Sequence, residues 1–308
     1  MQAYHYDSFT FPLPADHRFP AAKYYRLSQA ILERGILPAA DLRIPQPASR
    51  EQLELVHTPA YVSSVFEGTL TEKEVRRMGL PWSLELVERA RRSVGSTIAV
   101  CRAAFNEGIA ASLGGGTHHA YPDHGEGYCI FNDVAVAARV MLAEDRAQRI
   151  AILDCDVHQG NGTAAIFAGD ANVFTFSIHG AKNFPFHKET GSLDIALPDA
   201  TGDEVYLQAL QDGLDQVFLP GPFDLAIYLA GADPFQGDRL GRMALSKAGL
   251  ARRDELVFER CRQVKLPMAV TMSGGYAKEI EDIVDIHCET IRQAQALWQT
   301  LNPTLITQ

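Results

Sequence analysis

Five short apolar stretches of the sequence each lead into side chains that could do chemistry. The stretches span residues 108–113, 149–153, 173–178, 223–229 and 268–272. The reactive side chains at their ends are His118 and His119, then Asp154, Asp156 and His158, then Ser177 and His179, then Asp233, and finally Tyr276. Ligands of open parallel sheets bind at the carboxyl ends of the strands, so we expect these side chains to converge on one site.

Asp156 and His158 have the types and the spacing of metal ligands. Residues two apart at the end of an extended strand point to the same side, and Asp233, after a later strand, is the natural third ligand. Three protein ligands leave one position open for water or substrate, as in catalytic zinc sites. Mixed oxygen and nitrogen ligands also suit iron(II), which is the alternative ion. Considered alone, the segment that contains Asp154, Asp156 and His158 could instead be a turn with solvated acidic side chains and no metal.

Further groups have the chemistry of acid–base and electrophilic catalysis. His118 and His119 follow three glycines, which let both rings face one cavity, and they indicate an acid–base pair rather than a surface turn. Asp154 is better suited to accept a histidine ring N–H than to bind the metal itself. Tyr276 follows two glycines and could donate to a developing oxyanion. Its alternative role is structural, at the rim of the sheet.

The elements that must position these residues follow from the pattern of apolar residues. Uninterrupted apolar strands alternating with amphipathic helices predict an α/β fold, with a parallel sheet covered on both faces. The expected helices span residues 84–104, 133–144, 203–218, 246–264 and about 278–298. Seven of the 16 prolines fall within residues 1–60, which favours loops and short helices packed on this core. We expect residues 1–308 to form a single domain.

The composition narrows the class of protein. The chain has 28 basic and 38 acidic residues, for a net charge of -10, which argues against direct binding to nucleic acid or anionic membrane and would suit a cationic partner. Its five cysteines include no C-x-x-C pair and are expected to be free thiols of a cytoplasmic protein. No apolar run approaches the ~20 residues of a membrane span.

Four motifs in chain order resemble the signatures of the histone deacetylase family. They are GGGTHHAYPDHGEGYCIFND, ILDCDVHQGNGT, LAGADPFQGDRLG and MSGGYA, which together span residues 114–277. The upstream segments VHTPAYV and RMGLPWS are also similar to family segments. The form DVHQGNG, together with SGGY, is most similar to the class IV branch.

The resemblance implies a fold and a catalytic centre. The implied fold is the arginase/deacetylase-like α/β fold, with three layers and a central, mainly parallel β-sheet of about eight strands. The implied zinc ligands are Asp156, His158 and Asp233. The implied catalytic residues are His118 and His119, Asp154 behind the first histidine, Asn161 behind the second, and Tyr276 on the acyl carbonyl. Asn161 stands where class I enzymes have an aspartate, so we expect His119 to stay neutral at pH 7.

The resemblance also implies a substrate tunnel and a second ion. The tunnel would hold an acyl-lysine side chain, with walls of Gly127, Tyr128 and Phe184 and with Leu240 at its rim. The second ion is a structural potassium beneath the metal. Its implied ligands, partly backbone carbonyls, are Asp154, Asp156, His158, Ser177 and Ile178.

The predicted activity is metal-assisted removal of acetyl or longer acyl groups from the lysine side-chain nitrogen of proteins or peptides. An acetylpolyamine or other small-molecule amidohydrolase on the same fold is the main alternative. A phosphohydrolase is more remote: the segment ILDCDV suits one, but the ends of the later strands offer Asp233 and Tyr276 and no obvious lysine. The other alternative is a non-catalytic acyl-lysine binder. It is remote because all the expected catalytic residues are present.

Overall fold

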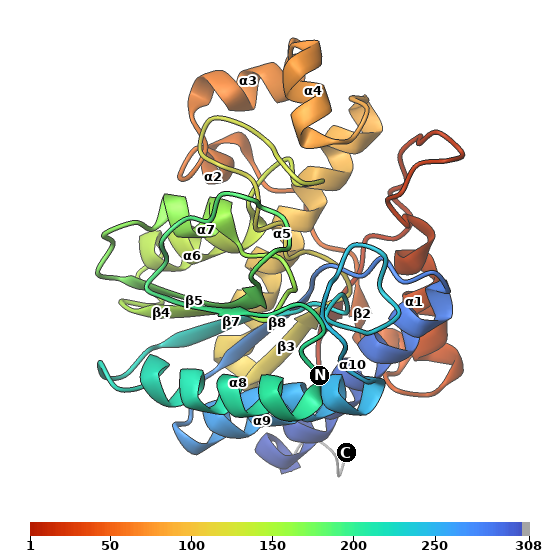
Figure 1. The fold of residues 1–308 in the computed structure, drawn as a ribbon. Coiled ribbons are helices and arrows are strands. Elements are labelled where there is room, and N and C mark those ends of the chain that lie inside the picture. Colours follow the sequence, from red (N-terminus) through yellow and green to blue (C-terminus); the bar gives the residue numbers. More distant parts are fainter. Residues whose placement is uncertain (304–308) are drawn as a thin grey trace.

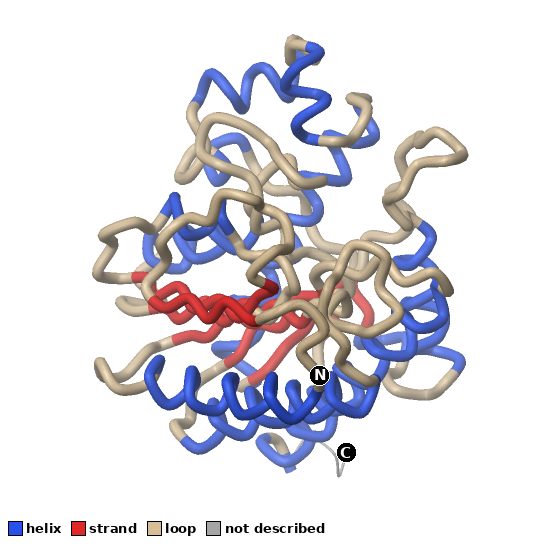
Figure 2. The backbone as a smooth tube through the Cα atoms, in the orientation of Figure 1, coloured by secondary structure: helices blue, strands red, loops and turns tan. Residues whose placement is uncertain are grey.

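A single parallel sheet is the centre of the molecule. The computed structural model describes residues 1–303, and within them eight strands form one sheet in which all neighbours are parallel. The strands are β1 (Ala3–Tyr4), β2 (Leu42–Arg43), β3 (Ile109–Ser112), β4 (Ile150–Asp154), β5 (Val173–Gly180), β6 (Leu193–Leu197), β7 (Leu225–Ala230) and β8 (Met268–Met272). Figure 2 shows the sheet as a red band between two layers of helices.

Helices cover both faces of the sheet (Figure 1). On one face α5 (Leu84–Glu107) packs against α6 (Asp133–Ala143), which also contacts the short α7 (Asn161–Ile166). On the other face α9 (Lys247–Gln263) lies between α8 (Asp203–Val217) and α10 (Ile280–Leu301), and α1 (Ala22–Glu33) packs on α10. The remaining short helices are a 3₁₀ turn (Ala39–Asp41), α2 (Arg50–Leu53), α3 (Pro59–Glu67) and α4 (Glu72–Met78).

The strands explain why their sequences read as unbroken apolar runs. In β4, Ile150 and Ile152 join the core beneath α5 and α6, whereas Ala151 and Leu153 join the core beneath α8 and α9. Both faces of the strand are therefore out of water, as expected for a parallel sheet between helix layers. None of the helices within residues 1–303 has both the length and the apolar character that a membrane crossing requires.

The sheet order brings the reactive segments together. Across the sheet the strands run β2-β1-β3-β8-β7-β4-β5-β6. The five strands whose ends carry the reactive side chains are therefore five consecutive neighbours, β3, β8, β7, β4 and β5. Because all are parallel, their carboxyl ends open onto the same edge, as the sequence predicted.

The expected α/β fold is confirmed, and the ends of the predicted helices and strands lie within three residues of those observed. Three strands were missed. β1 and β2 are two residues long, too short for any periodicity, and β6 is a half-buried edge strand. Residues 1–60 are mostly loops and short helices, as expected, and they also contribute two two-residue strands and the 12-residue α1.

His57 connects the α2–α3 segment to the loop that carries the two adjacent histidines. Its ring is buried, with Nδ1 2.9 Å from the carbonyl of Tyr121 and with Nε2 accepting the N–H of Asn132 at 3.0 Å. Each ring nitrogen has a complementary backbone partner only when the imidazole is neutral. The neutral ring therefore ties two points of the loop together.

Acid should destabilise the fold through His57. Burial lowers the pKa of His57 from its ordinary value of 6.5 to about 4. Below pH 6.5 the unfolded chain binds a proton that the folded protein refuses, so the free energy of unfolding falls as the pH drops toward 4. The contribution is on the order of 3 kcal/mol, at about 1.4 kcal/mol per pKa unit. Urea unfolding at pH 7 and pH 4.5 measures it.

The control for this prediction is His57→Gln, which does not titrate. We expect the variant to be less stable at pH 7 but to lose less free energy on acidification. His179, whose pKa burial also lowers to about 4, titrates in both proteins and cancels in the comparison. Equal losses in the two proteins would contradict the prediction.

Candidate active site

Asp156, His158 and Asp233 form a compact buried trio. The imidazole Nδ1 of His158 lies 3.0 Å from Oδ1 of Asp156 and 3.2 Å from Oδ2 of Asp233. One potential ligand atom from each residue lies within 4.8 Å of the others. Strand β4 ends at Asp154, so Asp156 and His158 stand on the following loop and not on an extended strand. The predicted set converges, although by a loop and not by strand alternation.

Protein donors reach both oxygens of Asp156 but only one oxygen of Asp233. Oδ1 of Asp156 accepts the backbone N–H of His158 at 2.9 Å. Oδ2 of Asp156 accepts the hydroxyl of Ser273 and the N–H of Gly274, both at 2.7 Å. Oδ1 of Asp233 accepts the N–H of Val157 at 2.9 Å. Among the described residues, Oδ2 of Asp233 has no hydrogen-bond donor, although it is buried. A buried carboxylate oxygen without a donor is costly unless a cation faces it.

The electrostatics of the trio fit a divalent cation. Burial would lower the pKa of His158, but the close carboxylates of Asp156 and Asp233 outweigh burial and raise it. Burial and the charge of Asp156 raise the pKa of Asp233. The protein alone thus balances two buried carboxylates with a proton. A metal ion would supply that positive charge instead, and these residues could hold one.

Arg253 supports the two loops that carry the candidate metal ligands. It is fully buried on α9, and its Nη1 donates to the carbonyls of Gly231 and Cys155. These two carbonyls lie just before Asp233 and Asp156 in the chain. One guanidinium therefore fixes the spacing of two loops that come from different strands.

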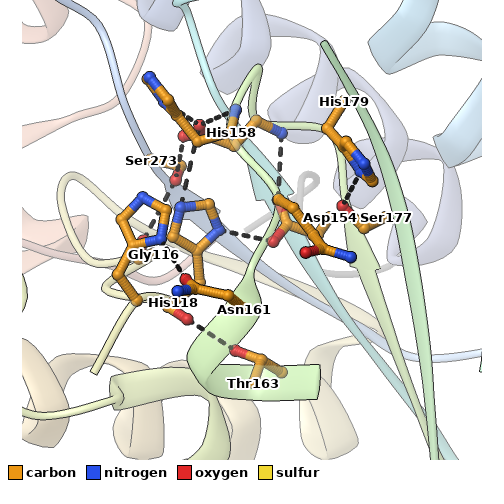
Figure 3. A network of polar contacts seen from close by, with 12 residues as sticks. Gly116, His118, Asp154, His158, Asn161, Thr163, Ser177, His179 and Ser273 are labelled. Atoms are coloured by element: carbon orange, nitrogen blue, oxygen red, sulfur yellow. Dashed lines mark hydrogen bonds and ion pairs between the residues drawn. The ribbon is translucent and has the colours of Figure 1, made fainter. Parts of the chain in front are cut away.

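His118 and His119 have opposite environments although they are adjacent. Nδ1 of His118 lies 2.6 Å from Oδ2 of Asp154, and Figure 3 shows this ring directed toward that carboxylate. Burial would lower the pKa of His118, but Asp154 and Asp156 outweigh burial and raise it to about 9. For His119, burial and the neighbouring histidines lower the pKa well below its ordinary value. At pH 7 one ring is protonated and the other is neutral, as expected for His119.

Asn161 determines the tautomer of His119. The carbonyl oxygen of the Asn161 side chain lies 2.6 Å from Nδ1 of His119. Its amide nitrogen donates to Oε2 of Glu126 at 3.1 Å and to the hydroxyl of Tyr121 at 3.2 Å, which fixes the orientation of the amide. A carbonyl oxygen only accepts, so Nδ1 of His119 carries the proton and Nε2 keeps a free lone pair. His119 is thus prepared as a base.

The loop that carries both histidines is held by two residues at the start of α6. The side chain of Asp133 accepts the N–H groups of Gly116 and Thr117 at 3.0 and 2.7 Å. The amide of Asn132 donates to the carbonyl of His118 at 3.3 Å. Asn132 also caps α6 through its own side-chain oxygen. The helix start and the histidine loop therefore form one rigid unit.

Tyr276 lies beside the trio on the turn after β8. Its ring centroid is 6.4 Å from that of His158, and burial keeps its pKa well above 10, so the hydroxyl is protonated. The buried ammonium of Lys23 donates to the carbonyls of Ser273 and Gly275 at 3.2 and 3.3 Å. Lys23 thus anchors the turn that presents the tyrosine.

A cavity of about 670 Å³ contains the remaining predicted residues. Its lining includes His119, His158 and Tyr276 together with all four residues predicted for the tunnel, Gly127, Tyr128, Phe184 and Leu240. Gly127 has φ of +55°, and a Cβ at this position would lie 2.6 Å from Cδ2 of His119. A larger residue at position 127 would therefore crowd the base.

Three of the five residues predicted for a potassium ion, Asp154, Ser177 and Ile178, lie on two neighbouring strands of the sheet. Asp154 of β4 pairs in register with Ser177 of β5, and Ile178 follows on the same strand. The hydroxyl of Ser177 lies 2.9 Å from Nδ1 of His179, and Figure 3 shows both beside Asp154. Ligation of an ion here stays a prediction.

Sequence reasoning missed several residues that organise the centre. Asn132 and Asp133 lie inside a recognised motif, so their position was visible but their role was not. Glu126 also lies in that motif, and nothing in the sequence links it to Asn161. Lys23 and Arg253 occupy ordinary amphipathic helices, where a charged residue usually indicates a solvated face.

The sheet between two helix layers, with a buried Asp–His–Asp trio at its strand ends, defines a hydrolase of the arginase/deacetylase-like fold. A family model described as "Histone deacetylase domain" matches residues 17–291. This match covers most of the chain, and the protein therefore belongs to the histone deacetylase family of amidohydrolases.

Relatives support this assignment. An uncharacterized protein of Picosynechococcus is 45% identical over 295 residues, which cover 96% of this chain and 98% of that protein. Histone deacetylase 2 of Arabidopsis thaliana is 28% identical, covering 92% of this chain and 76% of that one. The acetoin utilization protein AcuC of Staphylococcus aureus is 27% identical, covering 73% and 63%. The crystal structure of the HDA15 HD domain matches the fold with a TM-score of 0.81 at 22% identity, covering 99% of this chain and 94% of that one.

Gly274→Ala should weaken metal binding. A Cβ at this position would lie 1.7 Å from Oδ2 of Asp233 and 2.7 Å from Oδ2 of Asp156, so both carboxylates would have to move. We expect metal affinity to fall ~10- to 100-fold, the usual effect of disturbing groups that orient ligands. Competition with a fluorescent chelator measures the affinity. The control is Gly202→Ala, because its Cβ would meet nothing within 4 Å. Equal affinities in both variants would contradict the prediction.

Asn161→Asp should shift the pH dependence of activity. An aspartate behind His119 favours the imidazolium and raises its pKa by about 1–3 units. Since the neutral ring is the base, the acidic limb of the kcat/KM profile should move to higher pH. The carboxylate of Glu126 lies close to this position, so it would favour a protonated, neutral aspartate at position 161. Asn161→Asp combined with Glu126→Gln removes this second carboxylate and should therefore shift the acidic limb further. An unchanged acidic limb in both variants would show that His119 is not the base.

Proposed function

We propose that the protein removes acetyl groups from the lysine side-chain nitrogen of proteins or peptides by zinc-dependent amide hydrolysis. The observation that carries the proposal is that three side chains line one cavity. They are the neutral His119 with its free Nε2, the protonated Tyr276, and His158, which belongs to the Asp–His–Asp trio. Amide hydrolysis needs a base, an oxyanion donor and an electrophile within one reach. Membership of the histone deacetylase family supports the same conclusion.

Zinc is the ion that we propose for Asp156, His158 and Asp233, because oxygen and nitrogen donors in a three-ligand set are typical of catalytic zinc. Iron(II) suits the same donors, so metal content must be measured on the native protein. When bound, the ion supplies a Lewis acid that polarises the acyl carbonyl and lowers the pKa of water. We also retain potassium as a structural ion near Asp154 and Ser177.

The side chains then divide the proton transfers. Nε2 of His119 takes a proton from the attacking water, whose oxygen forms the new bond to the acyl carbon. The Tyr276 hydroxyl donates to the oxygen that becomes negative in the transition state. His118, protonated beside Asp154, gives its proton to the lysine nitrogen as the C–N bond breaks. The products are acetate and a free lysine amine.

Tyr276→Phe tests this assignment on an acetyl-lysine peptide. Loss of a donor that acts only in the transition state should lower kcat by ~10²–10³, while metal content stays unchanged and KM changes less than kcat. Single-turnover rates measure the effect. Tyr25→Phe, at an exposed position on α1, is the control. A loss smaller than about threefold, under ~0.7 kcal/mol of barrier, would exclude Tyr276 as the oxyanion donor.

Inhibitors separate the remote phosphohydrolase alternative in the same assay. A linear hydroxamate should compete with the peptide, because its two oxygens can chelate a metal while its chain occupies the cavity. Vanadate should have no effect. Vanadate sensitivity together with indifference to the hydroxamate would refute the deacetylase proposal.

A further inference from the structure

The mouth of the cavity is basic although the chain is acidic. Five basic side chains line the cavity, whereas Glu126 is the only acidic residue among its lining within the described part of the chain. The basic residues are Arg18, Arg77, Lys182, Arg239 and Arg242. The chain as a whole has 28 basic and 38 acidic residues. The local balance at the mouth is therefore the reverse of the global one.

The basic residues come from four separate segments. Arg18 belongs to the loop before α1, Arg77 to the last turn of α4, and Lys182 to the segment after β5. Arg239 and Arg242 belong to the loop after β7. All five are exposed. Figure 1 shows the red N-terminal loop and the orange α4 at the periphery of the molecule, outside the central sheet. The basic surface is therefore assembled by the fold and does not come from a run of basic residues in the sequence.

Nearby acids leave most of this charge uncompensated. Arg18, Arg77 and Lys182 have no acidic partner within 4 Å in the part of the chain that the structure describes. Arg242 lies 3.4 Å from Asp199, and both side chains are exposed, so this ion pair is weak.

The other candidates for compensation have different partners. Glu126 accepts the amide of Asn161. Asp238 accepts three backbone N–H groups, those of Leu240, Gly241 and Tyr276. Arg239 donates through Nε to the carbonyl of Tyr276 at 3.0 Å, a contact that leaves its positive charge unneutralised. Both acids keep their negative charge, but neither forms an ion pair with the five basic side chains in the described part of the chain. The basic side chains outnumber them, so the mouth carries a net positive charge around the approach to His119.

We propose that the substrate is an acyl-lysine flanked by acidic residues, whose carboxylates face this ring of basic side chains. The proposal rests on the deacetylase function above and names its substrate class. An acyl-lysine side chain in the cavity leaves its own backbone and its sequence neighbours at the mouth. Aspartate or glutamate at those neighbours would meet Arg77 and Lys182, and charge complementarity of this kind mainly determines specificity and association rate.

The same ring disfavours a cationic substrate. An acetylated polyamine would carry its remaining ammonium group to the mouth, among the five basic side chains. The net charge of -10, which taken alone suits a cationic partner, does not decide the matter. Fields are screened over about 8 Å at physiological ionic strength, so a substrate in the mouth responds mainly to the groups that line it.

A peptide series tests the charge preference. Three acetyl-lysine peptides of equal length carry aspartate, alanine or arginine at the two positions on each side, and N-acetylputrescine is the small cationic substrate. We expect kcat/KM to fall in the order acidic, neutral, basic, with at least a tenfold difference between the extremes in 50 mM salt. The difference should shrink severalfold in 500 mM salt because of screening. N-acetylputrescine should be poorer than the neutral peptide.

Charge reversal at the mouth supplies the matched variants. In Arg77→Glu combined with Lys182→Glu, the ratio of kcat/KM for the acidic and basic peptides should fall at least tenfold. Arg252→Glu is the control, because Arg252 is exposed on α9 and does not line the cavity. This control should keep the wild-type ratio. A preference for the basic peptide or for N-acetylputrescine, or an unchanged ratio in the double variant, overturns the proposal.

Binding separates failure of this proposal from failure of the proposed activity. If none of the peptides is hydrolysed, the deacetylase function fails. Calorimetric titration of the Tyr276→Phe variant with the same three peptides then decides the charge preference. Tighter binding of the acidic peptide supports the basic mouth as its docking surface, and equal or weaker binding refutes it.

Discussion

Two aspartates buried on either side of one imidazole are the constraint on which the rest of the structure depends. Asp156 and Asp233 can be ionised out of water only if every oxygen has a donor or a cation. The protein supplies donors to both oxygens of Asp156 and to one oxygen of Asp233, whose other oxygen faces His158. Gly274 is needed at this point, because a Cβ would occupy the space of the Asp233 carboxylate. The parallel sheet provides the two strand ends that bring these acids together.

The fold was predictable from sequence where a strand is buried on both faces. Such strands read as apolar runs, and the runs located β3, β4, β5, β7 and β8. The edge of the sheet was not predictable, because β6 is half-exposed and β1 and β2 are held mainly by their neighbours. The convergence of the candidate site was predictable, because reactive residue types follow each of five parallel strands and the carboxyl ends of such strands meet at one edge. Lys23, Glu126 and Arg253 could not be found in this way, because their partners lie far away in the chain.

Net charge alone does not determine which substrate the cavity mouth receives. The value of -10 sums groups all over the surface, whereas a substrate responds to those within about a Debye length. The basic groups at the mouth converge from four segments that no sequence window contains. Their density became visible only when the loops were placed in space. A global acidic balance and a local basic mouth are compatible because salt screens one from the other.

The division of labour between His118 and His119 follows from what stands behind each ring. A carboxylate behind His118 stabilises the charged form, and an amide behind His119 cannot do so. The amide still fixes the tautomer, because Glu126 accepts its N–H and turns its carbonyl toward the ring. Two adjacent residues of the same type thereby have opposite protonation states at one pH. Asp154 ends β4 and Asn161 begins α7, so one short segment of the chain carries the partners of both histidines as well as the candidate metal ligands Asp156 and His158.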